Sequence, residues 1–366
     1  MTCIHNLVNN NYLEVNLKKI TELKGLTLLP KEKLIIAMQR LNKDGTMFQL
    51  IVSNDGKLLG TLTDGDIRRS IIEGKTAEST VMECMKKNPS KGKLSSPNDY
   101  KRLFNSVSSL IKFLPVVNHN NILKFILIEE YIKNYKSALI MAGGFGKRLG
   151  KKTKYIPKPL LKIGDKTVLE NLLQKLEKEN FNKIYISTFY LYQKIVGFVK
   201  NRKSKSIIKI LIEDKPLGTA GCISLLDDED KELVMVINAD IVSDIDFNSI
   251  SIFHNEKLND ITIPVSKYSH QIPFGVINFD KELNYKNLKE KPILDYFVMS
   301  GIYFLSRKVC DLVKNEAIDM PDLIERGRLL NFKIGIFPIY EYWKDIGSIE
   351  DLNKVRAKIK NIDLAK

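Results

Sequence analysis

Arg148 and Lys158 stand in a stretch whose residue types suit the binding of phosphate groups. Arg148 follows the glycine-rich run Gly143-Gly144-Phe145-Gly146, and Lys158 lies between two prolines. Glycines let backbone N–H groups approach an anion closely, and a helix that begins after the loop would add its dipole. The chemistry indicated is the positioning of a phosphorylated ligand. The alternative is a glycine-rich turn followed by a solvated basic pair.

Two common phosphate-binding motifs do not fit this stretch. The Walker loop requires a glycine where Met141 stands and Ser or Thr where Arg148 stands. The dinucleotide fingerprint, if it started at Gly144, would require a glycine at Leu149. Both motifs are therefore excluded.

The elements that must position these residues alternate between strands and helices from Ser137 onward, which predicts a doubly wound α/β sheet. Asp240 closes the central strand, and the carboxyl end of a parallel strand is where such sheets place ligand chemistry. The alternative is an aspartate in an ordinary turn. Strands are predicted at 138–142, 183–188, 207–212 and 232–238, and helices at 168–179 and 193–200.

Length and composition limit the classes of protein that need to be considered. The 366 residues predict two or three domains, and 44% hydrophobic residues can fill a sizeable core. The net charge of +15 suggests a nucleic-acid partner, but the basic residues are scattered and are mostly Lys rather than the Arg that reads bases. We therefore expect no nucleic-acid partner.

The four cysteines, Cys3, Cys84, Cys222 and Cys310, show no metal or redox spacing, which indicates a reducing compartment. The first ten residues lack the apolar segment of a signal peptide, and no apolar run approaches the length of a membrane span. We expect a cytoplasmic protein without a membrane partner.

The N-terminal third repeats one pattern of helix, strand, strand and helix. Residues 1–24 are weakly patterned and predict a small helix or an extended arm, and the polar residues 90–99 predict a linker between the copies. The first copy consists of a helix after Pro30, strands at 47–53 and 57–63 around a hairpin turn, and a helix from Asp64. The second copy consists of a helix at 98–110, strands at 113–117 and 122–128, and a helix at 129–135.

This repeat resembles a tandem cystathionine-β-synthase (CBS) module of α+β type, placed at 1–135. The first copy carries the G-x-x-T-x-x-D element of that family as Gly60, Thr63 and Asp66. The resemblance implies that Thr63 and Asp66 bind the ribose and phosphate of an adenine nucleotide. The second copy departs from the element, with Lys124, Leu127 and Glu130 at the corresponding positions. The alternative is a structural or dimerising module without a ligand.

Residues 136–366 resemble the sugar-1-phosphate nucleotidylyltransferases. Arg148, within G-G-x-G-x-R-L, and Lys158 begin the family signature, and the remaining elements follow in family order. They lie at 213–221, 238–240, 274–276, 289–292, 300–303 and 343–351, where Ser348 replaces the usual Thr. The hexapeptide repeat of some relatives is absent after Trp343.

The resemblance implies a Rossmann-like nucleotidyltransferase sheet and a role for each motif. Arg148, Lys158, Asp240 and Asp345 are the implied catalytic residues, and the two aspartates would hold Mg²⁺. The implied nucleotide-binding residues are Ala142, Gly143, Gly144, Gly146, Glu213, Gly218 and Thr219. The implied sugar-phosphate-binding residues are Gly275, Glu290, Lys291 and Ser300.

The implied reaction requires these residue types. An oxygen of a sugar 1-phosphate attacks the α-phosphorus of a nucleoside triphosphate, so two polyanions must meet and charge neutralisation is the main task. Mg²⁺ prefers one or two carboxylates with phosphate oxygens and water, and Arg binds phosphate oxygens bidentately. No nucleophilic side chain is needed because the sugar phosphate is already ionised.

Glu213 predicts GTP as the preferred triphosphate. It stands where relatives that use pyrimidines have Gln, and an ionised carboxylate only accepts hydrogen bonds. Guanine offers two adjacent donors, whereas uracil and thymine would direct carbonyl groups at the carboxylate. The alternative is that Glu213 points to solvent and the backbone alone reads the base.

A CBS module joined to this transferase resembles the glucosamine-1-phosphate guanylyltransferases of legionaminic acid pathways. Another sugar, such as mannose 1-phosphate, or another base remains an alternative. A different class, a CBS nucleotide sensor with an inactive transferase scaffold, is disfavoured by the intact Arg148, Lys158, Asp240 and Asp345. We expect a homo-oligomer.

Overall fold

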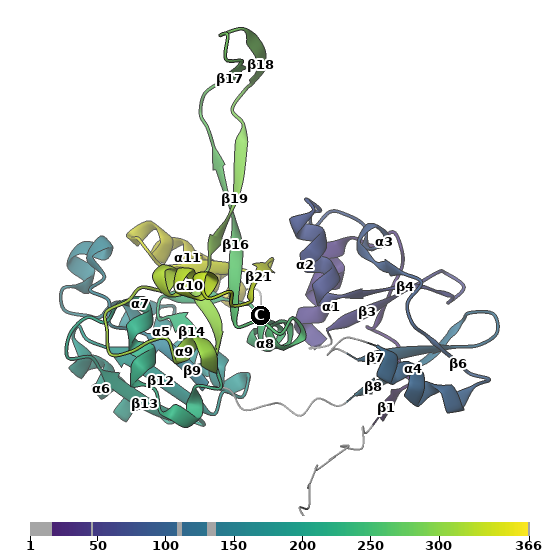
Figure 1. Ribbon diagram of the computed structural model, residues 1–366, viewed down its shortest axis with the longest axis horizontal. Coiled ribbons are helices and arrows are strands. Elements are labelled where there is room, and N and C mark those ends of the chain that lie inside the picture. Colours follow the sequence, from purple (N-terminus) through teal and green to yellow (C-terminus); the bar gives the residue numbers. More distant parts are fainter. Residues whose placement is uncertain (1–16, 45–46, 108–111, 130–136, 365–366) are drawn as a thin grey trace, which may run out of the picture. The chain divides into compact units, whose positions relative to one another are not determined.

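The computed structural model describes residues 17–44, 47–107, 112–129 and 137–364 (Figure 1). The chain divides into two compact units. One comprises Met1–Ile67 with Thr76–Ile132, and the other Arg68–Lys75 with Lys133–Lys366. Across the described part of the chain, no helix combines the length and the apolarity that a bilayer crossing requires.

The larger unit is built on a mixed eight-stranded sheet, as the α/β prediction requires. The strand order is β13-β12-β9-β14-β20-β16-β19, with β21 paired to β16. The first four strands run parallel, whereas β20 is antiparallel to both β14 and β16. The bounds are β9 (Ser137–Met141), β12 (Lys183–Thr188), β13 (Ile207–Ile212), β14 (Leu233–Asn238), β16 (Ile261–Gln271), β19 (Ile293–Met299), β20 (Ile302–Ser306) and β21 (Ile334–Ile339).

Two hydrophobic cores cover the two faces of this sheet. Ala138 and Ile140 of β9 pack in one core with the leucines of α5 (Val168–Lys178). Leu139 between them packs in the other core with residues of α9 (Arg307–Cys310) and α10 (Met320–Leu329). Successive side chains of a strand point to opposite faces, so a strand buried on both sides must be apolar throughout. This explains why the short apolar runs predicted β9, β12 and β14 to within a residue, whereas the edge strand β13, which is also apolar, has no buried residue.

Helices and short strands complete the larger unit. The α5 and α6 helices match the helices predicted at 168–179 and 193–200 to within one residue. The helices are α5 (Val168–Lys178), α6 (Tyr192–Lys200), α7 (Gly218–Gly221), α8 (Phe247–Glu256), α9 (Arg307–Cys310), α10 (Met320–Leu329) and α11 (Ile349–Leu364), with 3₁₀ turns η2 (Lys147–Thr153), η3 (Lys158–Leu160), η4 (Cys222–Leu225) and η5 (Asp228–Asp230). The short strands are β10 (Lys162–Ile163), β11 (Lys166–Thr167), β15 (Ile241–Ser243) and β22 (Trp343–Asp345).

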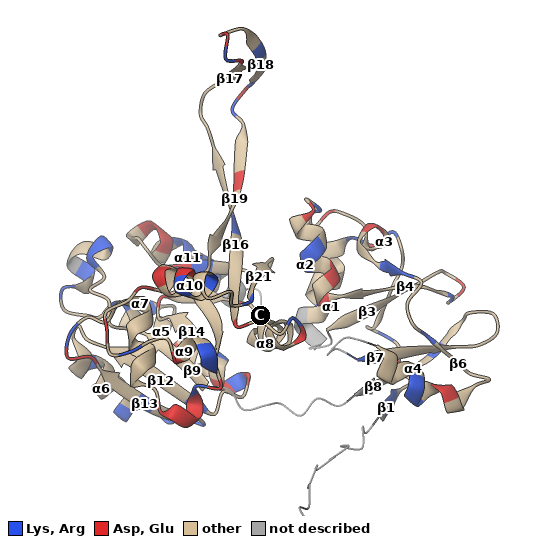
Figure 2. Ribbon diagram, viewed as in Figure 1, with Lys and Arg blue, Asp and Glu red and all other residues tan. Residues whose placement is uncertain are grey.

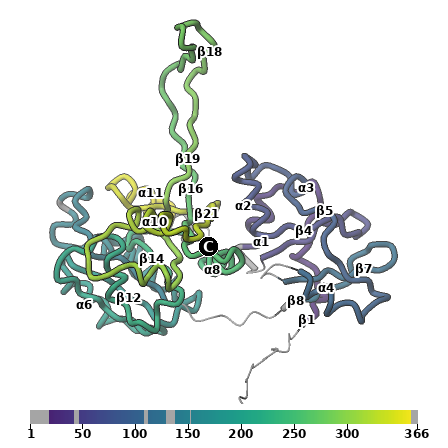
Figure 3. The backbone as a smooth tube through the Cα atoms, in the orientation of Figure 1, coloured from purple at the N-terminus to yellow at the C-terminus, as the bar shows by residue number. Residues whose placement is uncertain are grey.

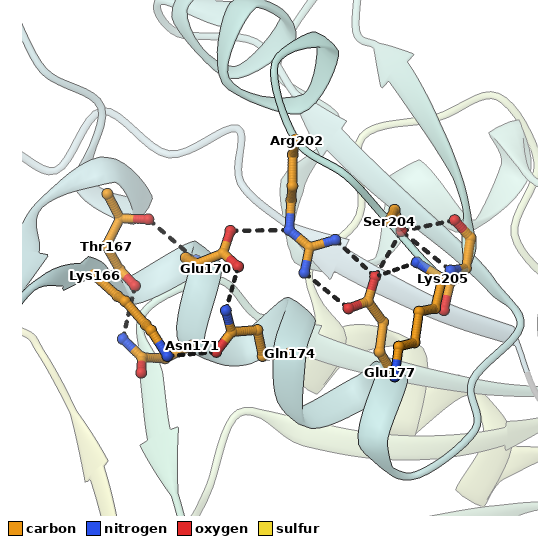
Figure 4. Close-up of polar contacts among 10 residues, drawn as sticks. Lys166, Thr167, Glu170, Asn171, Gln174, Glu177, Arg202, Ser204 and Lys205 are labelled. Atoms are coloured by element: carbon orange, nitrogen blue, oxygen red, sulfur yellow. Dashed lines mark hydrogen bonds and ion pairs between the residues drawn. The ribbon is translucent and has the colours of Figure 1, made fainter.

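A buried guanidinium fixes α5 against the turn that follows α6 (Figure 4). Arg202 donates from Nη1 and Nη2 to the two carboxylate oxygens of Glu177 at 2.6 and 2.8 Å, and from Nε to Glu170 at 2.9 Å. This bidentate contact lowers the pKa of Glu177 to about 2. The N-terminus of α5 is capped by Thr167, whose hydroxyl accepts from the N–H of Glu170. The helix is therefore anchored at both ends beneath the sheet.

A two-stranded ribbon leaves the sheet where β16 and β19 extend beyond their neighbours (Figure 1). It continues into β17 (Val276–Phe279) and β18 (Tyr285–Lys289), which form an antiparallel sheet of their own. We name residues 267–299 the arm. None of these residues, all of which the structure describes, is buried.

The smaller unit contains two four-stranded sheets with the same pairing pattern. In each, a short strand runs parallel to the first strand of a hairpin, and the second strand of the hairpin pairs antiparallel with another short strand. The repeated strand pattern predicted from the sequence is therefore present. The strands are β2 (Thr27–Leu28), β3 (Phe48–Val52), β4 (Leu58–Thr63) and β5 (Lys86–Lys87), then β6 (Gly92–Lys93), β7 (Phe113–Val117), β8 (Leu123–Glu129) and β1 (Leu17–Ile20).

The two sheets meet through equivalent positions. Phe48 and Phe113, which begin β3 and β7, stack with ring centroids 4.0 Å apart and an interplanar angle of 5°. The turns of the two hairpins are joined by a β-bridge between Lys57 and Ile122. The helices of this unit are α1 (Leu34–Asp44), α3 (Val81–Cys84) and α4 (Tyr100–Ser106), with the 3₁₀ turn η1 (Pro97–Asp99). The α2 helix (Asp64–Ile72) begins in this unit, and its residues from Arg68 belong to the larger one.

Two sequence predictions for the smaller unit need correction. The predicted linker at 90–99 contains β6, where Gly92 packs so closely that a Cβ there would lie 2.9 Å from the ring of Tyr100. The helix predicted at 98–110 is α4, which ends at Ser106. Two predicted segments lie outside the described residues, namely residues 1–16 and the helix at 129–135 with Glu130. Of the second segment only Glu129 is described, and it ends β8.

Candidate active site

A cavity of about 410 Å³ lies at the carboxyl ends of β9 and β14. β9 lies between β12 and β14 in the sheet. The next strands along the chain, β12 and β13, lie on one side of β9, whereas β14 lies on its other side, so the cavity lies where the strand order reverses. Its volume suits a small-molecule ligand. The lining residues are Met141, Ala142, Gly143, Gly144, Phe145, Gly146, Lys147, Arg148, Leu149, Lys158, Pro159, Glu213, Pro216, Gly218, Thr219, Asn238, Ala239, Asp240 and Gly347.

The glycine-rich loop forms one wall of this cavity. Gly146 adopts φ 64°, a left-handed conformation that glycine tolerates, and its carbonyl accepts a hydrogen bond from the Thr153 hydroxyl at 2.9 Å. At Gly144 an added Cβ would meet no atom within 4 Å, so its backbone is open to a ligand. The residues that follow, from Lys147, form the 3₁₀ turn η2, which Gly150 interrupts with φ 58°. The α-helix start considered from the sequence is absent there, and phosphate binding must rely on loop N–H groups and cationic side chains.

The four predicted catalytic residues converge. The Lys158 ammonium forms a hydrogen-bonded ion pair with Asp240, and its Nζ lies 3.7 Å from Oδ1 of Asp345. Arg148 packs over Gly347, where an added Cβ would lie 3.1 Å from Nη1. Burial and the charge of Asp240 both raise the pKa of Asp345. Arg148, Lys158 and Asp240 thus line one end of the cavity, and Asp345, which is not a lining residue, lies next to Lys158.

Glu213 lies in the wall and does not point to solvent, so the solvent-facing alternative was wrong. Its side chain is buried, with Oε1 accepting from the Ser187 hydroxyl at 2.6 Å and Oε2 from the N–H of Leu217 at 2.9 Å. Gly143 faces it, and a Cβ there would lie 3.0 Å from Oε1. The glycine keeps the carboxylate accessible to the cavity.

Gly218 and Thr219 connect the cavity wall to the start of α10. Gly218 adopts φ 77°, and an added Cβ would lie 2.6 Å from the carbonyl oxygen of Ile318. Both the N–H and the hydroxyl of Thr219 donate to Oδ1 of Asp319, at 2.9 and 3.1 Å. The hydroxyl in turn accepts from the N–H of Met320. In this arrangement the Thr219 side chain orders the wall.

The residues predicted to bind the sugar phosphate are divided between two places. Gly275, Glu290 and Lys291 lie on the arm and do not line the cavity. Ser300 is buried at the base of β20, and its carbonyl accepts from the indole N–H of Trp343 at 2.8 Å. The next residue, Gly301, packs against the side chain of Asn238, which does line the cavity.

Nine lining residues were not among the predicted site residues, and three of them have a polar or aromatic side chain. Asn238 precedes Ala239-Asp240, and its place at the end of an apolar strand was the available signal. Phe145 lies in the glycine-rich loop, and its ring centroid is 5.3 Å from that of Tyr190. Lys147 Nζ lies 5.5 Å from the centroid of the Phe145 ring. An aromatic side chain and a cation within a glycine-rich phosphate-binding loop were the available signals for Phe145 and Lys147.

Thr63 and Asp66 meet at the start of α2. Oδ2 of Asp66 accepts from the N–H and the hydroxyl of Thr63, at 2.8 and 2.7 Å, and the Asp66 N–H donates back to the Thr63 hydroxyl. These bonds form a capping box, a structural role that either residue can hold with or without a ligand.

Three comparisons bear on the family. The family model described as Nucleotidyl transferase matches residues 137–362. The chain is 30% identical over 227 residues to the probable mannose-1-phosphate guanylyltransferase 1 of Oryza sativa subsp. japonica, covering 58% of this chain and 62% of that protein. It is 28% identical over 244 residues to the bifunctional protein GlmU of Methanococcus maripaludis, covering 61% of this chain and 56% of that protein.

Among solved structures, HddC from Yersinia pseudotuberculosis aligns with a TM-score of 0.49 and 25% identity, covering 61% of this chain and 99% of HddC. The chain spans about three fifths of the length of the curated relatives it matches. The family model covers more than half of the chain and all of the residues that line the cavity. The chain therefore belongs to the nucleotidyl transferase family.

Proposed function

We propose that the larger unit transfers a nucleoside monophosphate, preferably from GTP, to a sugar 1-phosphate, giving a nucleoside diphosphate sugar and pyrophosphate. One observation carries this proposal: a single cavity joins an open glycine-rich backbone, two cationic side chains and the Asp240 carboxylate, and the Asp345 carboxylate lies beside it next to Lys158. Two polyanions can meet only where their charges are neutralised, and this cavity supplies the groups to do so.

Each group has a place in the reaction. The loop N–H groups near Gly144 and the Arg148 guanidinium hold the triphosphate, and Lys158 holds the phosphate of the sugar substrate. An oxygen of that phosphate forms a bond to the α-phosphorus. The bond from the α-phosphorus to the oxygen that leads to the β-phosphate breaks, and pyrophosphate leaves with that electron pair.

Asp240 and Asp345 are suited to hold Mg²⁺. Oδ1 of each carboxylate is buried and accepts no hydrogen bond within the described structure, so each has an oxygen free to coordinate a cation. Mg²⁺ is bound by one or two carboxylates together with phosphate oxygens and water. When bound, the ion would neutralise charge that develops on the phosphate oxygens.

Glu213 supports the choice of GTP. Ser187 and Leu217 fix its two oxygens, and each oxygen retains a further lone pair for an outside donor. The N1–H and N2–H₂ groups of guanine can donate to such a carboxylate together. The names of several relatives, which are mannose-1-phosphate guanylyltransferases, agree with this base.

For the sugar we propose glucosamine 1-phosphate, within a pathway of the legionaminic acid type. The basis is the resemblance of the whole chain, with its repeated N-terminal unit, to guanylyltransferases of that type. Mannose 1-phosphate is the alternative, which the relatives' names favour. We place the reaction in the cytoplasm, as the dispersed cysteines suggest.

We further propose that the smaller unit is a CBS module. The duplicated sheets and the Thr63–Asp66 pair at the start of α2 support this assignment. Its ligand would be an adenine nucleotide, and the alternative is a purely structural or dimerising role.

The test is a pyrophosphate-release assay with five triphosphates, GTP, ATP, UTP, CTP and dTTP, each combined with glucosamine, mannose and glucose 1-phosphates. We expect release only when a sugar phosphate is present, and the highest rate with GTP. The absence of release from every pair would instead favour a nucleotide sensor built on an inactive scaffold, and a preference for a pyrimidine would overturn the role of Glu213.

A further inference from the structure

The arm, residues 267–299, projects from the sheet as a narrow ribbon (Figures 1 and 3), and many of its large apolar side chains are exposed. The exposed fractions are 72% for Phe274, 60% for Phe279, 79% for Leu283 and 67% for Tyr285. Several large apolar side chains are thus exposed on one narrow ribbon, and an isolated two-stranded hairpin is marginally stable in water. The arm therefore has the character of a segment that packs against another molecule.

The two strands of the arm are joined by specific cross-strand hydrogen bonds and an ion pair. Asp295 accepts from the Ser269 hydroxyl at 2.6 Å and pairs with Lys267 at 2.8 Å across the strands, and Asn278 donates to Asn287 at 2.7 Å nearer the tip. Figure 2 shows that the two long strands are mostly uncharged apart from these groups and that charges gather toward the tip. Cross-strand pairs of this kind fix the register of a ribbon.

The base of the arm is held rigidly in the sheet. β16 runs without interruption from Ile261 to Gln271, and its pairing with β19 continues without a register shift from Val265–Met299 to Gln271–Ile293. Eleven residues of strand extend about 36 Å. Folding the arm back over its own cavity would require β16 and β19 to bend sharply together, which would break ladder hydrogen bonds at the bend.

The arm also carries residues that the catalytic cavity lacks. Glu290 and Lys291, predicted to bind the sugar hydroxyls and the sugar phosphate, lie between β18 and β19. Gly275 faces Glu290 across the ribbon, where an added Cβ would lie 3.0 Å from Oε2. Lys291 adopts φ 44°, a left-handed conformation that a side-chain-bearing residue takes at a cost of about 1 kcal/mol or more. The backbone therefore adopts an unfavourable conformation at Lys291, which is a predicted contact of the sugar phosphate.

We propose that the arm packs on a second copy of this chain and places Glu290 and Lys291 at the sugar side of the second copy's cavity. The exchange is reciprocal, so two copies form a closed dimer with two complete sites. The apolar side chains of the arm are buried in this dimer, and the cavity of each copy alone lacks the Glu290 and Lys291 side chains. This inference rests on the proposed function for the role of Glu290 and Lys291, but the dimer contact does not.

Subunit mixing tests the exchange. One full-length chain carries Asp240→Asn, which disables its cavity, and a differently tagged full-length chain carries Glu290→Gln with Lys291→Ala, which disables its arm. The two are co-expressed and the mixed assembly is isolated through both tags. Because the first chain supplies an intact arm to the intact cavity of the second, we expect about half of the wild-type turnover per dimer.

The controls are the two homodimers, which are each expected to have under about one tenth of wild-type turnover because every site carries a lesion. A mixed assembly as inactive as the homodimers would show that each arm serves its own copy and would overturn the proposal. Failure to recover any assembly that carries both tags would overturn it as well.

A second measurement reads the contact without activity. Light scattering should give wild type twice the mass of the chain, and Phe279→Asp together with Tyr285→Asp should give the monomer mass. Leu329→Asp, at an equally exposed apolar residue on α10, is the matched control and should remain a dimer. A monomeric wild type, or a dimer unaffected by the arm variant, contradicts the exchange. An inactive wild type that still dimerises through the arm would reject the proposed function alone.

Discussion

Asp240 and Asp345 are joined through the backbone, because the N–H of the residue after Asp345 donates a hydrogen bond of 3.1 Å to the carbonyl oxygen of Asp240. In the same β15–β22 pair, Ile241 is aligned with Asp345. Backbone pairing of two distant segments therefore places both carboxylates next to the Lys158 ammonium. The site does not depend on side-chain packing alone for its geometry.

Loss of either carboxylate should abolish turnover and spare the fold. We expect Asp240→Asn and Asp345→Asn to lower kcat by at least about 100-fold at saturating Mg²⁺, because each removes a negative ligand of the ion. Steady-state kinetics with thermal unfolding measures both effects. Asp244→Asn, an exposed carboxylate just after β15, is the control and should keep wild-type kcat. Near-normal kcat in either site variant would refute the metal assignment.

Glu213→Gln should weaken the preference for GTP over UTP by about 10- to 100-fold, which corresponds to about 1–3 kcal/mol for one lost charged hydrogen bond. The amide presents a donor where guanine also presents donors. The measurement is the ratio of kcat/KM for the two triphosphates. Ser187→Ala, which removes only a support of the carboxylate, should keep most of the preference. An unchanged ratio in Glu213→Gln would mean that the backbone reads the base.

Ionisation of the buried Glu179 should lower the free energy of unfolding of the larger unit as pH rises. It accepts from the N–H of Phe247 at 2.8 Å and lies 3.1 Å from Lys175, but burial raises its pKa from 4.5 to about 7. The folded state binds this proton more tightly than the unfolded state, so its stabilising effect is complete below pH 4.5 and is lost as pH rises toward 7.

Glu179→Gln keeps the side-chain carbonyl that accepts from Phe247 and has no charge to bury. Above pH 7 we expect it to raise the free energy of unfolding by about 1–3 kcal/mol relative to wild type. At pH 4.5 the difference should be small. Urea unfolding at pH 4.5, 6 and 8 gives the comparison, and a difference that does not grow with pH would show that Glu179 is ionised throughout.

The smaller unit should bind AMP through Thr63. Thr63→Ala in the full chain should remove the calorimetric signal of AMP, whereas Thr63→Ser, which keeps the hydroxyl bonded to Asp66, should retain it. Asp240→Asn should bind AMP like wild type, because the transferase cavity is a different site. If neither AMP nor ATP produces heat or a thermal shift attributable to this unit, the unit is a structural module.

The central strands of the larger unit were predictable because each is buried on both faces. The run at 138–142 has no polar residue to obscure its limits, and the structure assigns β9 as Ser137–Met141. The convergence of Arg148, Lys158 and Asp240 was also predictable, since strand ends and the loops after them meet at one edge of a parallel sheet. The position of Asp345 depended on the family resemblance.

Other features left no clear signal in the sequence. The segment after the glycine-rich loop, Lys147–Thr153, has residues that suit an α-helix, but the left-handed conformation of Gly150 interrupts it. β6 is only two residues long and lies in a polar stretch, so neither strand length nor alternation predicted it. The exposure of the arm was equally hidden, because a segment such as 293–299 has the apolar content of a buried strand.

Transfer of label from the α-phosphate tests the central claim most directly. The full chain is incubated with Mg²⁺, GTP labelled at the α-phosphate and glucosamine 1-phosphate, and the products are separated and counted. We predict that the label appears in a sugar nucleotide in a one-to-one ratio with pyrophosphate, and only when the sugar phosphate is present. Label that remains in GTP with every sugar phosphate tried, or release of single phosphate in place of pyrophosphate, would contradict nucleotidyl transfer by this site.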